Sequence, residues 1–367
     1  MSYQQMAVPP RSAHLWRYTP WPRVHPTKVE EVPQADGIQF SIEGQDANAF
    51  QRASDSDEIA RVFLDELGGT SYRLDIKGNG QVIHVRARAS GHIAVGHLNL
   101  NVKGDVTVLL HLTGEAGWCG LHITGNVNPN GNLGYGFINE LDANTKLLRC
   151  EDWLVERDAS LESATLSVGG FNCKSDLRTT LNGTGSSIRQ AITAHGQGAR
   201  HDDHHIEIHH LHGHTDSDLV TNAACSGSSH FVATGLLTIA EGADGSDAGQ
   251  VFRNLLLSEK ARAEAIPELE VLADDVSAAH GAASAPIDPS QLHYLMSRGL
   301  SREESESMIV NAVKGEKGID HDFLFKYANN NSQGRASRII VRFKNHKVAI
   351  NFAEKISEST ESCRTDP

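Results

Sequence analysis

The chain contains 367 residues and carries a formal net charge of -13. This acidic balance argues against sequence-independent nucleic-acid binding, which needs clustered cations against the phosphate backbone. No apolar run approaches the ~20 residues that span a bilayer, and the opening segment lacks the apolar region of a secretory signal. Five cysteines lie far apart without a C-x-x-C pair, which predicts reduced thiols and a cytoplasmic location.

The first 70 residues are predicted to form an irregular region that contains one helix. Proline, glutamine and aspartate are frequent up to about residue 50. A helix is expected over Ser54–Leu67, because Ser54 or Asp55 can cap it and acidic residues occupy its first turn. Gly68 and Gly69 are expected to end the helix. Its apolar stripe consists of Ile59, Val62, Phe63 and Leu67.

Over residues 71 to about 257, apolar side chains recur with the period of two that is typical of strands. Segments such as YRLDIKG, QVIHVRARA and HFVATGLLTIAEG show this alternation and end at glycine, asparagine or aspartate. No intervening segment has the length and periodicity of a crossover helix, which excludes a doubly wound α/β fold and leaves a sandwich, a barrel or a solenoid. Only Asn130-Gly131 and Asn182-Gly183 are strong turn signals, and the glycine spacing suits a parallel β-helix.

Two helices are predicted after the strands. Asp288 is expected to be the N-cap of the first helix, with Pro289 at the first helical position. Ser301 and Glu304 form a capping box that opens the second helix. Residues 316–367 are predicted to be a variable tail, in which the segment RIIVRFKNHKVAINF forms either a small hairpin or a last helix.

Short motifs spread over the chain resemble a known family. In chain order they are Leu15–Pro20 (LWRYTP), Asn254–Ser258 (NLLLS), Pro267–Glu270 (PELE), Ala273–Val276 (ADDV), His280–Ala282 (HGA) and Tyr294–Gly299 (YLMSRG). This series resembles the SufB/SufD family, the scaffold proteins of the Suf iron–sulfur cluster assembly system, and it is more similar to SufD than to SufB.

The resemblance implies an all-β core over residues 71–285, a right-handed parallel β-helix flanked by short N- and C-terminal helical segments. At ~20–25 residues a coil, this region is expected to hold roughly eight or nine coils. The resemblance also implies that the helical segment 286–315 docks a SufC-like ATPase. The residues expected to form that docking surface are Leu292, Leu295, Met296, Met308 and Ile309.

The function that the resemblance implies is a SufD-like scaffold, not an enzyme. Its partners would be the SufC-like ATPase and either a SufB-like chain or a second copy of itself, because an open solenoid end offers unpaired strand edges. An Fe–S cluster would be held transiently at such an interface, with no tightly bound cofactor. The sequence has no Gly-x-x-x-x-Gly-Lys-Ser/Thr motif, so ATP hydrolysis by a P-loop is assigned to the partner.

By the same resemblance, His280 lies at the interface and is implicated in holding the nascent cluster. We expect it just past the last strand, before the first C-terminal helix. A neutral imidazole is a competent iron ligand, and the alternative is a histidine that caps the helix or bonds a neighbouring carbonyl. SufB-like chains carry an essential cysteine near the segment that reads GQVFRN here, and Glu-His-Glu where this chain has Ala-His-Gly. This chain lacks that cysteine and those glutamates, which favours a SufD-like partner over the sulfur-accepting scaffold itself.

Eight histidines lie between His195 and His214. His205 and His209, with Glu207, share one face of a strand and could hold Zn, Fe or Ni. We favour a structural ladder of stacked side chains on adjacent coils. The alternative function is a His-rich metal-dependent hydrolase or a carbohydrate-active enzyme on a β-helix. No grouping of acidic and basic residues marks a lyase site, and with only 6% aromatic residues the chain offers little for sugar stacking.

Overall fold

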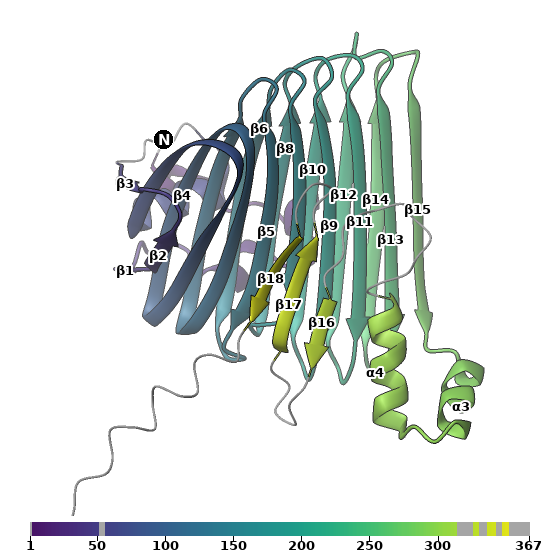
Figure 1. Ribbon diagram of the computed structural model, residues 1–367. Coiled ribbons are helices and arrows are strands. Elements are labelled where there is room, and N and C mark those ends of the chain that lie inside the picture. Colours follow the sequence, from purple (N-terminus) through teal and green to yellow (C-terminus); the bar gives the residue numbers. More distant parts are fainter. Residues whose placement is uncertain (1, 51–55, 314–325, 330–335, 343–346, 352–367) are drawn as a thin grey trace, which may run out of the picture. The chain divides into compact units, whose positions relative to one another are not determined.

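The computed structural model describes residues 2–50, 56–313, 326–329, 336–342 and 347–351. The chain divides between Ile287 and Asp288 into two compact units. In the first unit the strands lie side by side in a parallel β-helix, as Figure 1 shows. The predicted solenoid, with short helices before and after its strands, is therefore confirmed.

The strands of the β-helix form two parallel sheets that share the long strand β4 (Thr70–Val127). Consecutive strands alternate between the two sheets, so each coil contributes one strand to each. The even sheet continues from β4 through β6 (Lys146–Val155), β8 (Asn172–Leu181), β10 (His201–His210), β12 (His230–Ile239) and β14 (Arg262–Val271). The odd sheet continues from β4 through β5 (Asn132–Leu141), β7 (Ser160–Ser167), β9 (Ser187–Gly196), β11 (Asp216–Cys225), β13 (Asp247–Leu256) and β15 (Ser277–Pro286).

Neighbouring coils are aligned in register. His201 of β10 lies opposite Asn172 of β8 on one side and opposite His230 of β12 on the other. The spacing between such partners ranges from 26 residues (Lys146 and Asn172) to 32 residues (His230 and Arg262). The stack therefore has about six turns. The prediction of eight or nine coils is wrong, because each coil holds two long strands and two turns and so uses more residues than expected.

Apolar side chains fill the interior in stacks that run from coil to coil. In β10, Ile206 and Ile208 point inward and are fully buried. Ile206 lies opposite Leu177 of the preceding coil, and Ile208 lies opposite Leu237 of the following coil. Inward and outward side chains alternate along each strand, as the period of two requires. Burial of these stacks, at about 25 cal/mol per Å² of apolar surface, is the main term that stabilises the coils.

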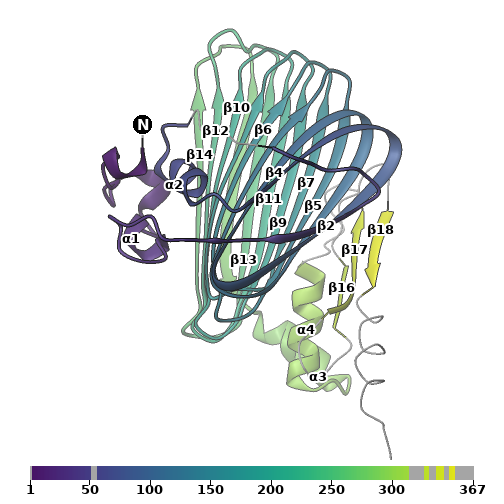
Figure 2. The same ribbon diagram turned by 90° about the vertical axis from the view of Figure 1, so that its left-hand side faces the viewer.

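The N-terminal segment lies against the even sheet, on the side where Figure 2 places α1 and α2. Its helices are η1 (Tyr3–Gln5), η2 (His14–Trp16), α1 (Trp21–Val24) and α2 (Ile59–Leu67). Between α1 and α2 come three short strands, β1 (Asp36–Gly37), β2 (Gln39–Glu43) and β3 (Asn48–Ala49). They pair with β4, the first in parallel and the other two antiparallel. The first coils are therefore covered by strands of the same chain.

Helix α2 begins later than the sequence predicts. Its first residue is Ile59, because Ser56 Oγ accepts a hydrogen bond from the Glu58 backbone N–H (3.1 Å) and forms a turn outside the helix. The two predicted capping residues lie outside the described residues. Gly68 ends the helix with a φ of 71°, as predicted. A second apolar cluster joins α2 to the rest of the segment and to the even sheet; it includes Trp16, Trp21, Phe63, Leu64, Trp118 and Leu148.

The second unit contains two helices and a small antiparallel sheet. Its elements are α3 (Pro289–Ser297), α4 (Arg302–Val313), β16 (Lys326–Asn329), β17 (Ala336–Arg342) and β18 (Lys347–Asn351). Asp288 caps α3 by accepting a hydrogen bond from the Ser290 N–H (2.8 Å). Ser301 and Glu304 form both bonds of the predicted capping box (2.8 and 3.2 Å). β17 and β18 pair antiparallel, so the hairpin is the form that this tail segment adopts.

We expect Gly114→Ala to destabilise the β-helix strongly. Gly114 has a φ of 107°, and an added Cβ would clash with the carbonyl oxygen of Ala89 on the neighbouring coil. Gly198 is the matched control, because its φ of 60° is also positive but no atom lies within 4 Å of the added Cβ. In urea unfolding, Gly198→Ala should cost about 1 kcal/mol and Gly114→Ala more than roughly 3 kcal/mol. Equal losses would contradict the close approach of the coils.

Candidate functional site

The C-terminal end of the β-helix leaves a strand edge accessible. β15 pairs with β13, and no other strand among the described residues pairs with it. Every residue of β15 except Gly281 is exposed, and most of them are alanine or serine. The backbone N–H and C=O groups along such an edge can pair with a strand of another chain. This terminal edge is the first candidate interaction site.

His280 lies in the middle of β15, exposed to solvent and opposite Gln250 of β13. The prediction that it follows the last strand is therefore wrong, because backbone pairing with β13 overrides the weak strand preference of alanine and glycine. Hydrogen bonds tie the terminal coil together. Gln250 Nε2 donates to the Glu268 carbonyl oxygen of β14 (2.8 Å), and Asn254 Nδ2 donates to Ser284 Oγ of β15 (3.0 Å).

The histidine-rich segment is strand β10, and alternation divides its polar side chains between two faces. The inward face, which contains the buried isoleucines, carries Asp202, His204 and His210. The outward face carries His201, Asp203, His205, Glu207 and His209. The histidines therefore occupy separate environments instead of one cluster.

The N-terminal segment covers part of the outward face of β10. Thr19 Oγ1 donates a hydrogen bond to Asp203 Oδ2 (2.5 Å) and accepts one from His201 Nε2 (2.8 Å). Lys174 Nζ of β8 lies 2.9 Å from Asp203 Oδ1. All four side chains are buried. The LWRYTP motif of the sequence is thus a part of the N-terminal region that contacts the even sheet.

His205 uses both of its ring nitrogens in hydrogen bonds. Nδ1 pairs with Thr234 Oγ1 on the next coil (2.7 Å), and Nε2 pairs with Glu207 Oε1 (2.8 Å). His209 Nε2 lies 3.3 Å from Glu207 Oε2. A metal ion held by His205 and His209 would have to displace these bonds.

His210 is buried inside the β-helix, between Thr215 Oγ1 at Nδ1 (2.7 Å) and Ser217 Oγ at Nε2 (2.8 Å). Burial disfavours the charged imidazolium, and it lowers the pKa of His210 to about 4. Burial beneath the N-terminal segment lowers the pKa of His201 to about 4 as well. Both side chains are therefore neutral at pH 7.

Opposite charges on three neighbouring coils line up across the even sheet. Arg178 of β8 lies in register between Asp152 of β6 and Glu207 of β10. Arg61 of α2 reaches this row and pairs with Asp152 (2.8 Å) and with the fully buried Asp176 (2.5 Å). This alternation of charge, which we call the charge ladder, fastens α2 to β6 and β8.

A polar cavity of about 390 Å³ adjoins the charge ladder and is lined by Arg61, His122, Asp152 and Arg178 among others. Burial alone would raise the pKa of Asp152. The hydrogen bond from His122 and the charge of Arg61 outweigh burial and hold this pKa well below its ordinary range. Asp152 is therefore a carboxylate at neutral pH and accepts hydrogen bonds from both neighbours.

In the second unit, part of the predicted docking set is exposed. Met296 is 41% exposed and Met308 is 49% exposed. Leu295 is half-buried, and Leu292 and Ile309 are buried. The two methionines are thus the members of the set with the most surface for a partner.

Neither Arg61 nor His122 was predicted from the sequence to belong to a polar site. A signal was present for Arg61, because it is the one cation within the segment IARVFLDEL, where a charge among apolar residues indicates a buried ion pair. No local signal marks His122, since its partners come from other coils. Thr19 belongs to the LWRYTP motif, but its partner His201 in β10 is 182 residues away in the chain.

The part of the chain that matches a known family comprises the β-helix and the first two helices after it. Residues 73–313, more than half of the chain, match the family described as SUF system FeS cluster assembly, SufBD core domain. The chain belongs to this SufBD family. The resemblance drawn from the short motifs is therefore confirmed.

Several relatives carry the same family name. The iron–sulfur cluster assembly protein SufD of Escherichia coli (strain K12) is 30% identical over 226 residues, which cover 60% of this chain and 53% of that protein. SufD of Bacillus subtilis (strain 168) is 31% identical over 189 residues, covering 51% and 43%. A SufBD family protein of Mycobacterium leprae is 25% identical over 347 residues, covering 84% and 85%. The chain thus spans about half the length of the two SufD proteins.

Within the described residues, none of the helices combines the length and apolar character that crossing a membrane requires.

We expect the protein to lose stability as the pH falls from about 6.5 to 4. In this window the unfolded chain binds protons at His201 and His210, whereas the folded chain, with both pKa values near 4, does not. Each histidine contributes at most about 3 kcal/mol to this loss in the free energy of unfolding. The free energy of unfolding, measured with urea at several pH values, should fall less steeply with decreasing pH in His210→Asn than in the unchanged chain. Identical slopes would contradict the buried neutral state of His210.

Proposed function

We propose that this SufBD-family chain is a SufD-like component of iron–sulfur cluster assembly, a scaffold that works in the cytoplasm. In this proposal residues 71–285 form the scaffold and residues 286–315 form the docking segment for an ATPase. The observation that carries it is the exposed edge strand β15 with His280 at its centre, in a chain whose core belongs to the SufBD family. The hydrolase and carbohydrate-enzyme alternatives gain no support from the hydrogen-bonded histidines of β10.

The cysteines favour the SufD-like role over that of a sulfur acceptor. Cys119, Cys150, Cys173 and Cys225 are all buried. Burial raises the pKa of Cys173 to about 12 and that of Cys225 to about 11. Sulfur transfer requires a thiolate, and these groups are thiols at neutral pH. Among the described residues no cysteine is thus suited to accept sulfur; Cys363 lies outside them.

The partner that the terminal edge would receive is another β-helix, either a SufB-like chain or a second copy. Apart from His280 and Pro286, strand β15 consists of alanine, serine and glycine, so few side chains obstruct the approach of a partner strand to its backbone. Pairing of this kind adds a strand to the sheet through main-chain hydrogen bonds. In such a pair His280 would lie beside the junction between the two chains.

At this junction His280 would supply an imidazole nitrogen to the nascent cluster. A single histidine cannot hold an Fe–S cluster, which needs further ligands. The partner would provide the thiolate and the remaining ligands, so the cluster is transient cargo shared by two chains. The exposed position of His280 in β15 allows such sharing, because a ligand buried within one chain would not reach the other.

A SufC-like ATPase would supply the energy for assembly by docking on α3 and α4. Met296 and Met308 are exposed on these helices, and Tyr294 of α3 is 56% exposed. Exposed methionine and aromatic side chains are frequent in protein interfaces. The buried Leu292 and Ile309 would maintain the helix pair that presents them.

We expect His280→Ala to reduce cluster yield while leaving assembly intact. The full chain would be co-expressed with its SufB-like and SufC-like partners and purified without oxygen, and iron, sulfide and subunit ratio would be measured. His92→Ala is the matched control, since His92 is an exposed strand histidine in an early part of β4. Normal cluster yield in the His280→Ala complex would exclude the ligand role. Loss of the complex itself would instead place His280 in subunit pairing.

A second variant tests the docking surface. Met296→Asp combined with Met308→Asp should abolish co-purification of the SufC-like ATPase, because it places two charges in an apolar contact. The free energy of unfolding should change by less than about 1 kcal/mol, since both side chains are exposed. Gln291→Asp, which adds charge at an exposed position near the start of α3, is the control and should retain the ATPase. Retention by the double variant would place the docking site elsewhere.

A further inference from the structure

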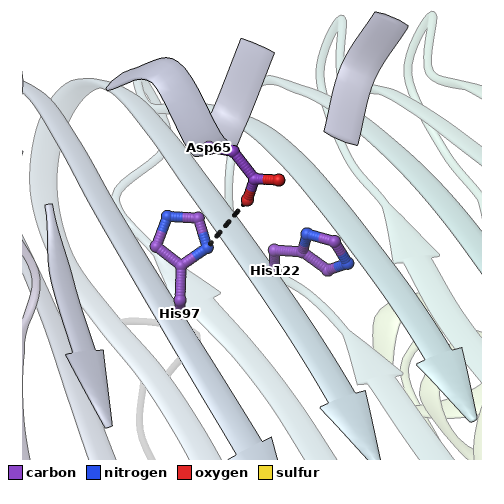
Figure 3. Close-up of side chains that lie close together, drawn as sticks. All are labelled: Asp65, His97 and His122. Atoms are coloured by element: carbon purple, nitrogen blue, oxygen red, sulfur yellow. Dashed lines mark ion pairs between the residues drawn. The ribbon is translucent and has the colours of Figure 1, made fainter. Parts of the chain in front are cut away.

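Three side chains from separate parts of the chain converge beside the polar cavity. Asp65 lies on α2, and His97 and His122 lie on successive coils of β4, as Figure 3 shows. One possible ligand atom from each residue lies within 4.8 Å of those from the other two. His97 Nδ1 lies 3.9 Å from Asp65 Oδ1. The two imidazole rings have centroids 6.2 Å apart.

Hydrogen bonds orient both imidazoles in the same way. His97 Nε2 lies 2.8 Å from the Gly68 carbonyl oxygen, which can only accept. His122 Nε2 lies 2.6 Å from Asp152 Oδ2, which is a carboxylate. Each Nε2 therefore donates a hydrogen, so in the neutral imidazole Nδ1 is the nitrogen that can bind a metal. A histidine that ligates a metal shows this pattern, with its other nitrogen donating to a carbonyl or a carboxylate.

The three side chains are buried or nearly so, and one of them, His122, lines the polar cavity. The side chains of His97 and Asp65 are 2% and 9% exposed, and that of His122 is fully buried. His122 and Asp152 also line the polar cavity of about 390 Å³. The nearest cation on α2, Arg61, is paired with Asp152 and Asp176, so its charge is compensated.

We propose that Asp65, His97 and His122 bind a divalent transition-metal ion of the Zn²⁺ or Fe²⁺ class. Two imidazoles and one carboxylate form the donor set that these ions prefer, with room for further ligands such as water. Mg²⁺ and Ca²⁺ are disfavoured, because they select oxygen ligands. The inference stands on these three residues and does not depend on the role of His280.

Binding requires the three ligand atoms, which lie within 4.8 Å of one another, to move closer together. In a tetrahedral zinc site with bonds of about 2.0–2.1 Å, ligand atoms lie roughly 3.4 Å apart. The His97–Asp65 approach of 3.9 Å would therefore close by about 0.5 Å, and the pairs that involve His122, which lie within 4.8 Å, by at most about 1.4 Å. Changes in side-chain rotamer can supply such movements. The bound ion would link α2 directly to two successive coils of the β-helix.

The test uses the full chain, freed of metal with a chelator. Titration with Zn²⁺, and anaerobic dialysis against Fe²⁺, should each give one bound ion and raise the melting temperature. His97→Gln and His122→Gln should reduce the bound metal to background, and Asp65→Asn should weaken affinity by more than about tenfold. Circular dichroism of each variant without metal checks that it is folded.

The matched control is His111→Gln, because His111 of β4 also pairs with a carboxylate, Glu140 Oε2 at 2.8 Å, but on the odd sheet. It should bind metal as the unchanged chain does, and so should His205→Gln. X-ray absorption of the zinc-loaded unchanged chain should show two imidazoles and oxygen, a result that does not depend on any variant folding. No binding at one equivalent, a sulfur ligand, or loss of binding in either control variant would overturn the proposal.

Discussion

Parallel, in-register stacking places residues that are one coil apart in the chain directly opposite one another. The charge ladder follows from this constraint, since Asp152, Arg178 and Glu207 face one another only when β6, β8 and β10 are aligned. Arg61 then ties α2 to the ladder through a buried pair with Asp176. Breaking a buried pair leaves an uncompensated charge and costs about 3–5 kcal/mol, so the position of α2 is strongly specified.

The two ends of the β-helix differ in whether further strands of the chain pair with them. At the N-terminal end, β1, β2 and β3 pair with β4. At the C-terminal end, β15 has no second strand partner among the described residues. Monomeric proteins usually cover or block such strand edges, because an unpaired edge promotes aggregation. An edge left accessible at one end, in a family of assembly proteins, is therefore consistent with a regular partner at that end.

Local signals in the sequence predicted local structure well. Asp288, Ser301 and Glu304 act as caps because capping depends only on neighbours in the chain. The strands were predicted from alternation, but the choice of a β-helix required the family resemblance. Coil length was underestimated, because the size of a coil depends on where its turns fall and not on strand periodicity.

The polar sites were less predictable, because their residues meet only after the coils stack. His97 and His122 belong to neighbouring coils, and Asp65 comes from a helix that packs across them. His280 was expected just past the last strand, whereas pairing with β13 makes its segment a strand. The histidine-rich segment was interpreted as a ladder of stacked side chains, with a metal site at His205 and His209 as the alternative, and strand alternation divides its histidines between two environments.

The repeating coil also has an evolutionary consequence. Each strand between the two ends of the stack bonds to the strands on either side of it, so stability is close to a sum of contributions from adjacent repeats. A duplication or deletion of one whole coil would preserve every remaining interface, whereas a shorter insertion would shift the register. Homologous cores should therefore differ in length by multiples of a coil, and the distance between their two ends should change in discrete steps.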